Sequence, residues 1–216
     1  MLEGPTLYAI VDPSRCSVAE GAGCDREVVE FTRAVLEGGA GVVQLRDKQG
    51  TSRQIYELAC QLAKVCGDYD VPFVVNDRMD IALAAGADGV HVGPEDVPVE
   101  AIVQLVEGEF IVGGSAGNLE NALELQRQGA DYLGVGAVYE ARESKPDASE
   151  PRGPQVLRSV VDSVDIPVVG IGGVDAMNAV EVMEAGAAGV AVIRALCSGD
   201  DPQKAARKLC EAITSS

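Results

Sequence analysis

The sequence predicts a single α/β domain over residues 1–216, a (β/α)8 TIM barrel of eight parallel strands with an outer ring of helices. Short apolar, β-branched runs alternate with helical patterns along the chain, as expected for repeated strand–helix units. A glycine–alanine pair between a helix and a strand recurs four times. The length of 216 residues lies near the lower end of the range of roughly 200 to 400 residues for this fold.

Eight apolar runs are the expected strands. They lack the polar–apolar alternation of a half-exposed sheet, which favours parallel strands buried on both faces. Pro72 and Pro167 precede two of them, at a position where a strand needs no backbone donor. The expected strands are Leu7–Val11, Val42–Leu45, Phe73–Val75, Gly89–Val92, Phe110–Val112, Tyr132–Val135, Val168–Ile171 and Gly189–Ile193.

Eight segments with helical spacing of their apolar residues are the expected helices. Each follows one strand, so the chain reads as four successive βαβα units. The expected helices are Asp25–Glu37, Ser52–Cys66, Met79–Ala85, Val99–Val106, Leu119–Gln128, Gln155–Val164, Ala176–Ala185 and Pro202–Ile213.

The repeat marks helix ends. It reads GGAGVVQL, AGADGVHV, QGADYLGV and AGAAGVAV, and the glycines before alanine are Gly39, Gly86, Gly129 and Gly186. We expect each of them to end a helix with a positive φ, which costs least for glycine. An open, doubly wound sheet is the alternative fold. That fold normally has a glycine-rich turn after its first strand, where this chain has VDPSRC, so the barrel is preferred.

The charge of the chain limits its partners. There are 17 basic and 34 acidic residues, giving a net charge of −17 with histidine neutral. Such a surface repels phosphates, which argues against nucleic acid or an anionic membrane as a partner. An anionic small substrate needs a local basic pocket. The surplus of acid itself is interpreted as an aid to solubility or an adaptation to salt.

The chain has no apolar run of the ~20 residues that span a bilayer and no signal-peptide pattern at its start, so a cytoplasmic protein is expected. The six cysteines, at positions 16, 24, 60, 66, 197 and 210, form no C-x-x-C pair, and there is a single histidine. A zinc site is therefore not expected, and the cysteines are expected to be reduced.

Polar side chains gather where the expected strands end, which is where barrels of this kind carry their chemistry. Asp77 and Asp96 follow adjacent strands and suit Mg²⁺, which prefers one or two carboxylates with substrate phosphate oxygens. Alternatively, they are ordinary salt-bridge partners of Arg78 or Arg46. Both readings are open from the residues alone.

Three cations follow strands two and six. Arg46, Lys48 and Lys145 could converge on a polyanion, although each could also be a solvated loop charge. Gly172 and Gly173, after the seventh strand, lie where barrels often bind phosphate through backbone N–H groups, but tight turns use the same residues.

The remaining residues narrow the chemistry. His91 is interpreted as a core imidazole in preference to a general base. No Ser–His–Asp set or Cys–His pair is evident, so covalent catalysis is unsupported. Two phosphate sites across one barrel mouth suggest an enzyme that joins two phosphorylated molecules or moves one that is anchored at both ends.

Several strings, in order from about residue 7 to about residue 196, closely resemble the thiamine phosphate synthase family. They are QLRDK, NDRMDIALAAGADGVHVGPED, GGSAGN, GADYLGVGAVY, SKPDA and IPVVGIGGVDAMNAVEVMEAGAAGVAVI. The resemblance implies Mg²⁺-dependent condensation of 4-amino-5-hydroxymethyl-2-methylpyrimidine diphosphate with 4-methyl-5-(2-phosphoethyl)thiazole. The implied products are thiamine phosphate and pyrophosphate, formed by ionisation of the pyrimidine diphosphate and capture of the cation by the thiazole nitrogen.

The resemblance also implies roles for individual residues. Arg46, Lys48, Lys145 and Ser115 are expected to act on the reacting groups. The implied Mg²⁺ ligands are Asp77 and Asp96, and the implied pyrimidine contacts are Gln44 and Ser115. The implied diphosphate contacts are Arg46, Lys48, Asn76 and Lys145, with Ser144 beside Lys145. The residues implied to surround the thiazole phosphate are Gly173, Ile193 and Arg194.

The sequence departs from the family pattern at four places, and these departures affect the thiazole side of the expected site more than the pyrimidine side. The segment Glu140–Glu143 replaces a common threonine motif, and Arg194 stands where serine is usual. Gly117 replaces a common histidine, and Pro94 a common glutamine. The alternatives are a thiazole tautomerase-like isomerase and a non-catalytic phosphate-ligand sensor. A homo-oligomer is possible, and Glu140–Gly153 is the candidate lid.

Overall fold

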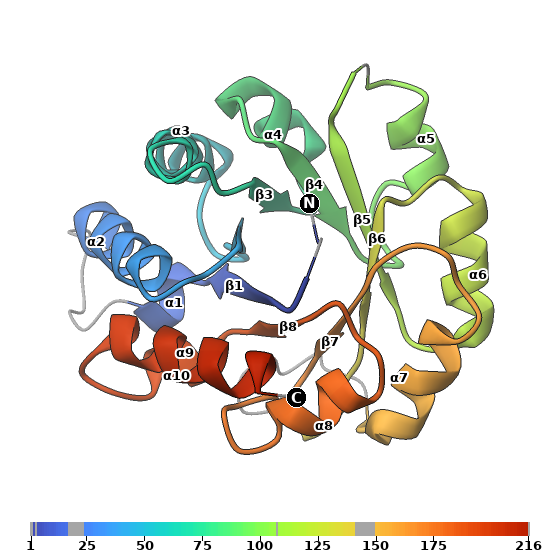
Figure 1. The fold of residues 1–216 in the computed structure, drawn as a ribbon. Helices are drawn as coiled ribbons and strands as arrows, with labels where there is room; N and C mark the ends of the chain where they lie inside the picture. Colours follow the sequence, from blue (N-terminus) through green and yellow to red (C-terminus); the bar gives the residue numbers. More distant parts are fainter. Residues whose placement is uncertain (1, 3, 17–23, 107, 141–149, 216) are drawn as a thin grey trace.

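Eight parallel strands pair in chain order and close into a barrel in the computed structural model of the protein (Figure 1). The structure describes residues 2, 4–16, 24–106, 108–140 and 150–215. The strands are β1 (Thr6–Val11), β2 (Val42–Leu45), β3 (Phe73–Asn76), β4 (Gly89–Val92), β5 (Ile111–Ala116), β6 (Tyr132–Val135), β7 (Val168–Ile171) and β8 (Gly189–Val192). Closure comes from β1, which pairs Tyr8 with Val42 of β2 on one side and Thr6 with Gly189 of β8 on the other. The predicted (β/α)8 barrel is confirmed.

Helices cover the outside of the barrel (Figure 1). They are α1 (Pro13–Cys16), α2 (Cys24–Glu37), α3 (Ser52–Gly67), α4 (Met79–Ala85), α5 (Val99–Val103), α6 (Leu119–Arg127), α7 (Gly153–Val161), α8 (Ala179–Glu184), α9 (Arg194–Cys197) and α10 (Pro202–Thr214). Among the described residues, none of the helices combines the length and apolar character needed to span a membrane.

Local sequence explains several helix ends. A capping box begins α3, because Thr51 accepts from the backbone of Gln54 while the Gln54 side chain accepts from the backbone of Thr51. Asp201 caps α10, whose first residue is a proline. The four repeat glycines all have positive φ, between 69° and 103°, and each lies at or just after the end of a helix, which confirms the expected glycine turns.

Two apolar layers hold the fold together. The larger lies between the outer face of the barrel and the helices, and the smaller fills the barrel interior. Tyr8 and Tyr132 lie within the interior layer, where both side chains are almost fully buried. Gly113 makes room for this ring, because a Cβ on Gly113 would lie 2.2 Å from Cζ of Tyr132.

The fifth strand corrects one expectation. It was expected at Phe110–Val112 but runs from Ile111 to Ala116, so Ser115 lies within the strand rather than after it. Gly113 and Gly114 look like the end of a strand in the sequence. They continue it because Tyr132 and Leu125 occupy the space that their side chains would fill.

Two short helices were not expected. The first, α1, follows β1 directly, and Asp12 accepts hydrogen bonds from the backbone and hydroxyl of Ser14 at its start. The second, α9, begins at Arg194, where the last strand was expected to end. In addition, α8 begins at Ala179 rather than Ala176, because Asp175 and Asn178 close a turn through their side chains.

Candidate active site

A pocket with both polar and apolar lining opens inside the barrel at the carboxyl ends of the strands. Five of the predicted site residues line it: Gln44, Arg46, Asn76, Ser115 and Ile193. These residues come from different strands or the positions directly after them, so the closed barrel brings together groups that are distant in the sequence. The pocket is also lined by Tyr8, Ile10, His91, Tyr132, Gly134, Val169, Ile171 and Ala191.

A chain of hydrogen bonds forms one wall of this pocket. The Gln44 amide nitrogen donates to the Tyr8 hydroxyl at 2.8 Å, and the hydroxyls of Tyr8 and Tyr132 lie 2.6 Å apart. The chain continues from the Tyr132 hydroxyl to Nδ1 of His91 at 3.0 Å, and from Nε2 of His91 to Oγ of Ser115 at 2.9 Å. It therefore joins the two residues expected to contact the pyrimidine.

The chain of hydrogen bonds has a preferred direction from donor to acceptor. Burial raises the pKa of both Tyr8 and Tyr132, so each phenol keeps its proton at neutral pH. Since Gln44 donates to Tyr8, every hydroxyl hydrogen is satisfied when Tyr8 donates to Tyr132 and Tyr132 donates to His91. Nε2 of His91 then carries its proton toward Ser115, which leaves the Ser115 hydroxyl as a donor to the pocket.

Two carboxylates meet at the rim above the pocket. Asp77, directly after β3, contacts Asp96, which follows β4 and accepts from the backbone N–H of Gly93 at 2.8 Å. Burial and the contact with Asp77 raise the pKa of Asp96, while the charge of Lys48 opposes this shift. Asp77 has a φ of 61° and its backbone N–H donates to the carbonyl of His91, so the turn itself aims its side chain.

The structure bears on one of the open alternatives for the two aspartates, an ion pair with Arg46 or Arg78. Neither pairs with the arginines that were considered, because Arg46 pairs with Asp12 at 3.0 Å and Arg78 with Asp80 at 2.6 Å. The cation at the pair is instead Lys48, which forms an ion pair with Asp77.

The carboxylate pair suits a divalent cation. Burial and the contact with Asp77 raise the pKa of Asp96, and a positive ion would relieve this crowding of negative charge. Mg²⁺ is commonly held by one or two carboxylates with water and substrate phosphate. Within the described ranges, no group of three or more histidine, cysteine or acidic side chains is placed to hold a metal. The pair thus fits a magnesium ion that is completed by its substrate.

The second candidate anion site follows β7 and β8. Gly172 and Gly173 have φ of 98° and 64°, and a Cβ on Gly173 would lie 2.5 Å from the carbonyl oxygen of Glu140. No described residue accepts a hydrogen bond from the backbone N–H of Gly173. Across from it, Ile193 is buried and Arg194, the first residue of α9, is exposed.

Two predicted residues cannot be placed. Ser144 and Lys145 lie outside the residues that the structure describes, as does most of the candidate lid Glu140–Gly153. Conversely, the sequence analysis did not single out Tyr8, Tyr132 or Asp12. The signal for the tyrosines was available, because both are polar aromatic residues within otherwise aliphatic strands.

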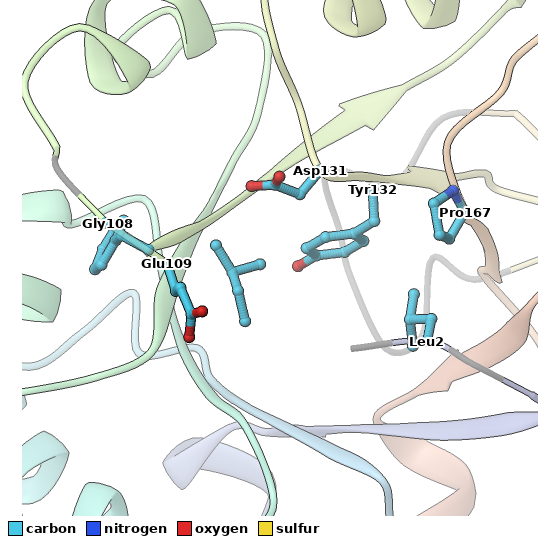
Figure 2. Close-up of a pocket in the computed structure, with 8 residues that line it drawn as sticks. Leu2, Gly108, Glu109, Asp131, Tyr132 and Pro167 are labelled. Atoms are coloured by element: carbon cyan, nitrogen blue, oxygen red, sulfur yellow. The ribbon is translucent and has the colours of Figure 1, made fainter.

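A larger cavity, of about 310 Å³, lies at the opposite end of the barrel (Figure 2). It is bounded by residues before or at the start of strands, including Glu109, Asp131 and Pro167, with Tyr132 on its inner side. Barrels of this type carry their active sites at the carboxyl ends of the strands, and the charged and polar cluster lies there. We therefore place the candidate active site in the smaller pocket.

The family model described as thiamine monophosphate synthase matches residues 7–196. The chain belongs to the thiamine monophosphate synthase family. Its activity is that of a thiamine-phosphate synthase, an enzyme of the transferase class that acts on small molecules.

Individual proteins that the chain resembles bear the name of the same enzyme. The chain is 48% identical over 203 residues to the thiamine-phosphate synthase of Chloroflexus aurantiacus, covering 94% of this chain and 90% of that one. It is 45% identical over 190 residues to that of Natronomonas pharaonis, covering 87% and 88%. A solved thiamine phosphate pyrophosphorylase from Pyrococcus furiosus matches with a TM-score of 0.85 and 40% identity, covering 97% of this chain and 96% of that one.

In this thiamine monophosphate synthase family member, replacing His91 with Asn is expected to lower kcat by less than about tenfold, because both ring nitrogens serve the hydrogen-bond chain. Loss of a general base would cost roughly 100-fold to 10,000-fold. The measurement is kcat and KM with both substrates. Tyr132→Phe, which removes a hydroxyl from the same chain, is expected to behave alike; inactivation by the His91 change alone would indicate proton transfer.

Proposed function

We propose that the protein condenses 4-amino-5-hydroxymethyl-2-methylpyrimidine diphosphate with 4-methyl-5-(2-phosphoethyl)thiazole, releasing thiamine phosphate and pyrophosphate. The observation that carries the proposal is the cluster of Asp77, Asp96 and Lys48 directly beside a pocket that contains Arg46 and Asn76. Carboxylates for a cation and basic groups for phosphates at one rim are what a diphosphate needs in an otherwise acidic protein.

The pyrimidine would bind against the hydrogen-bond chain. The Ser115 hydroxyl is available as a donor, and Gln44 presents its amide oxygen as an acceptor because its nitrogen serves Tyr8. An aminopyrimidine offers a ring nitrogen that accepts and an amino group that donates, which complements this pair. The buried chain of hydrogen bonds would therefore orient the pyrimidine ring before its diphosphate leaves.

Departure of the diphosphate depends on stabilising negative charge. Arg46 is held in place by Asp12, with both side chains largely buried, so its guanidinium is already oriented. Lys48 is half-exposed on Asp77 and can turn to a phosphate oxygen when the substrate arrives. We assign Lys145 and Asn76 to the same diphosphate, and Ser144 to the hydroxyl next to Lys145.

Mg²⁺ bound by Asp77 and Asp96 would supply positive charge to the leaving pyrophosphate. Lys48 would then give up its ion pair with Asp77 and follow the phosphate oxygens. The carboxylates would thus have a cationic partner both before and after substrate binding. The protein has no need of a nucleophile in such a dissociative reaction, in line with the residues of the pocket.

The thiazole phosphate is assigned to the rim between β7 and β8. The backbone N–H of Gly173 and the start of α9 at Ile193 and Arg194 are the groups assigned to this phosphate. The thiazole nitrogen would attack the pyrimidine methylene cation from this side. Arg194 would add a positive charge where the family usually has serine.

An assay for thiamine phosphate from the two purified substrates tests the proposal. We expect product and pyrophosphate in equal amounts with Mg²⁺, and a loss of at least about 100-fold when EDTA removes the metal. Formation of product at the same rate after metal removal would contradict the magnesium site. Binding of both substrates without turnover would support a sensor, and isomerisation of the thiazole phosphate alone would support a tautomerase.

A cytoplasmic location and a possible homo-oligomer stay predictions. The proposed partners are the two small-molecule substrates, with no nucleic acid or membrane. The acidic composition supports the last point, since a net charge of −17 repels polyanionic surfaces.

A further inference from the structure

Two thiols lie together at the mouth of the barrel. Sγ of Cys16, the last residue of α1, is 3.7 Å from Sγ of Cys197, the last residue of α9. The two residues are 181 positions apart in the sequence and meet because β1 and β8 are neighbours in the closed barrel. Figure 1 shows α1 and α9 next to each other on the same side of the barrel.

The two sulfur atoms need only a small movement to bond. A disulfide has an S–S distance of roughly 2.0 Å, against 3.7 Å between these thiols. The strands below are fixed by their register, with Ala9 opposite Val192. Cys16 and Cys197 instead lie in two four-residue helices above the strands, and both are only partly buried, so an oxidant can reach them.

We propose that Cys16 and Cys197 form a redox modification site, at which peroxide joins the two residues in a reversible disulfide that slows the synthase reaction. The other described cysteines with placed side chains, Cys60, Cys66 and Cys210, are also thiols, but no contact between sulfur atoms is recorded among them. The composition gave no hint of this pair, since neither cysteine belongs to a local motif.

The chemistry balances with peroxide as the oxidant. The Cys197 thiolate attacks one peroxide oxygen, so that an S–O bond forms, the O–O bond breaks and hydroxide leaves. The Cys16 sulfur then attacks the sulfur of the sulfenic acid, an S–S bond forms, and the second oxygen leaves as hydroxide. With the two thiol protons, the products are one disulfide and two waters. Two equivalents of a small thiol reverse the reaction by exchange.

The surroundings favour Cys197 as the attacking residue. The hydrogen bond from Cys16 lowers the pKa of Cys197, and the charge of Arg15 acts in the same direction, while burial and Asp12 oppose them. The same hydrogen bond and burial raise the pKa of Cys16. Both shifts are in the direction that makes Cys197 the attacking thiolate and leaves Cys16 to react with the sulfenic acid.

The bond would act on both halves of the site, and this part of the inference rests on the proposed function. Cys197 closes the helix that begins at Arg194, a residue assigned to the thiazole phosphate. Cys16 closes the helix that follows Asp12, which holds Arg46. Drawing α1 and α9 together displaces groups on which substrate alignment depends, and misplacement by an ångström can cost roughly 100-fold in rate.

The experiment starts from the reduced full-length protein and adds hydrogen peroxide in steps. Peptide mapping without reductant is expected to give one linked product containing Cys16 and Cys197, together with a loss of activity of about tenfold or more that dithiothreitol restores. Cys16→Ser and Cys197→Ser are expected to keep the activity of the reduced parent and to resist peroxide. Cys60→Ser, a partly buried cysteine on α3, serves as the matched control and is expected to respond as the parent does.

Several results would overturn the inference. They are separate oxidation of both residues without a linked peptide, a different pairing, or a linked peptide that leaves kcat and both KM values unchanged. Peptide mapping does not depend on catalysis, so a protein that forms the bond but never shows synthase activity would refute the proposed function and leave the modification site intact. Thermal unfolding of the serine variants confirms that they are folded.

Discussion

Asp77→Asn is expected to lower kcat by about 100-fold or more with both substrates saturating, and to raise the Mg²⁺ concentration needed for half-maximal rate. The change removes one charge without changing the size of the side chain. Asparagine also tolerates positive φ, so the turn at 61° is preserved. The reason for the loss is that the cation would keep one carboxylate ligand, Asp96, in place of two.

The measurement for this variant is a magnesium titration of the steady-state rate, with a thermal melt alongside it. Asp80→Asn is the matched control, because Asp80 lies three residues away, is exposed and pairs with Arg78. We expect the control to change kcat by less than about twofold, as is usual for an exposed ion pair. If Asp77→Asn lowers the melting temperature but keeps its magnesium response, the carboxylate has a structural role and the metal site is refuted.

Gly113→Ala is expected to give the largest loss of stability, about 3 kcal/mol in the free energy of unfolding. An alanine Cβ would lie 2.2 Å from Cζ and 2.5 Å from the hydroxyl oxygen of Tyr132, in a fully packed interior. The ring has to move, and its hydrogen bonds to Tyr8 and His91 are lost with it. Both the overpacking and the unsatisfied hydroxyls contribute to the cost.

Denaturant unfolding measures this change, and the corresponding drop in melting temperature is roughly 6 to 12 °C for a domain of this size. Gly67→Ala is the control, since Gly67 is the exposed last residue of α3 and nothing lies within 4 Å of a Cβ there. Its free energy of unfolding is expected to stay equal or to rise by up to about 1 kcal/mol. Equal effects of the two substitutions would contradict the packing argument.

The barrel could be predicted because the sequence signals for it are local and are repeated along the chain. The periodicity of strands and helices and the four glycine turns at Gly39, Gly86, Gly129 and Gly186 each depend on a few neighbouring residues. The contact between Asp77 and Asp96 was also predictable, because carboxyl ends of adjacent parallel strands share one rim. These features follow from chain order and the rules of parallel sheets.

Other features depend on contacts between distant parts of the chain. One example is the ion pair of Asp77 with Lys48 rather than with an arginine. It joins the segments that follow two neighbouring strands, β2 and β3. The length of β5 depends on the position of Tyr132, 19 residues after Gly113. Likewise, the meeting of Cys16 with Cys197 requires closure of the sheet. None of these has a local pattern that marks it in the sequence.

Tyr132 lines both the candidate pocket and the cavity at the amino end of the barrel, and Figure 2 shows its ring at the latter. Its buried side chain lines both of them from within the barrel. In the proposed mechanism, the ring would shield a carbocation formed in the candidate pocket from solvent in the other cavity, and fewer cations would be lost to the alcohol. The yield of the proposed condensation would then depend partly on a residue that contacts neither phosphate.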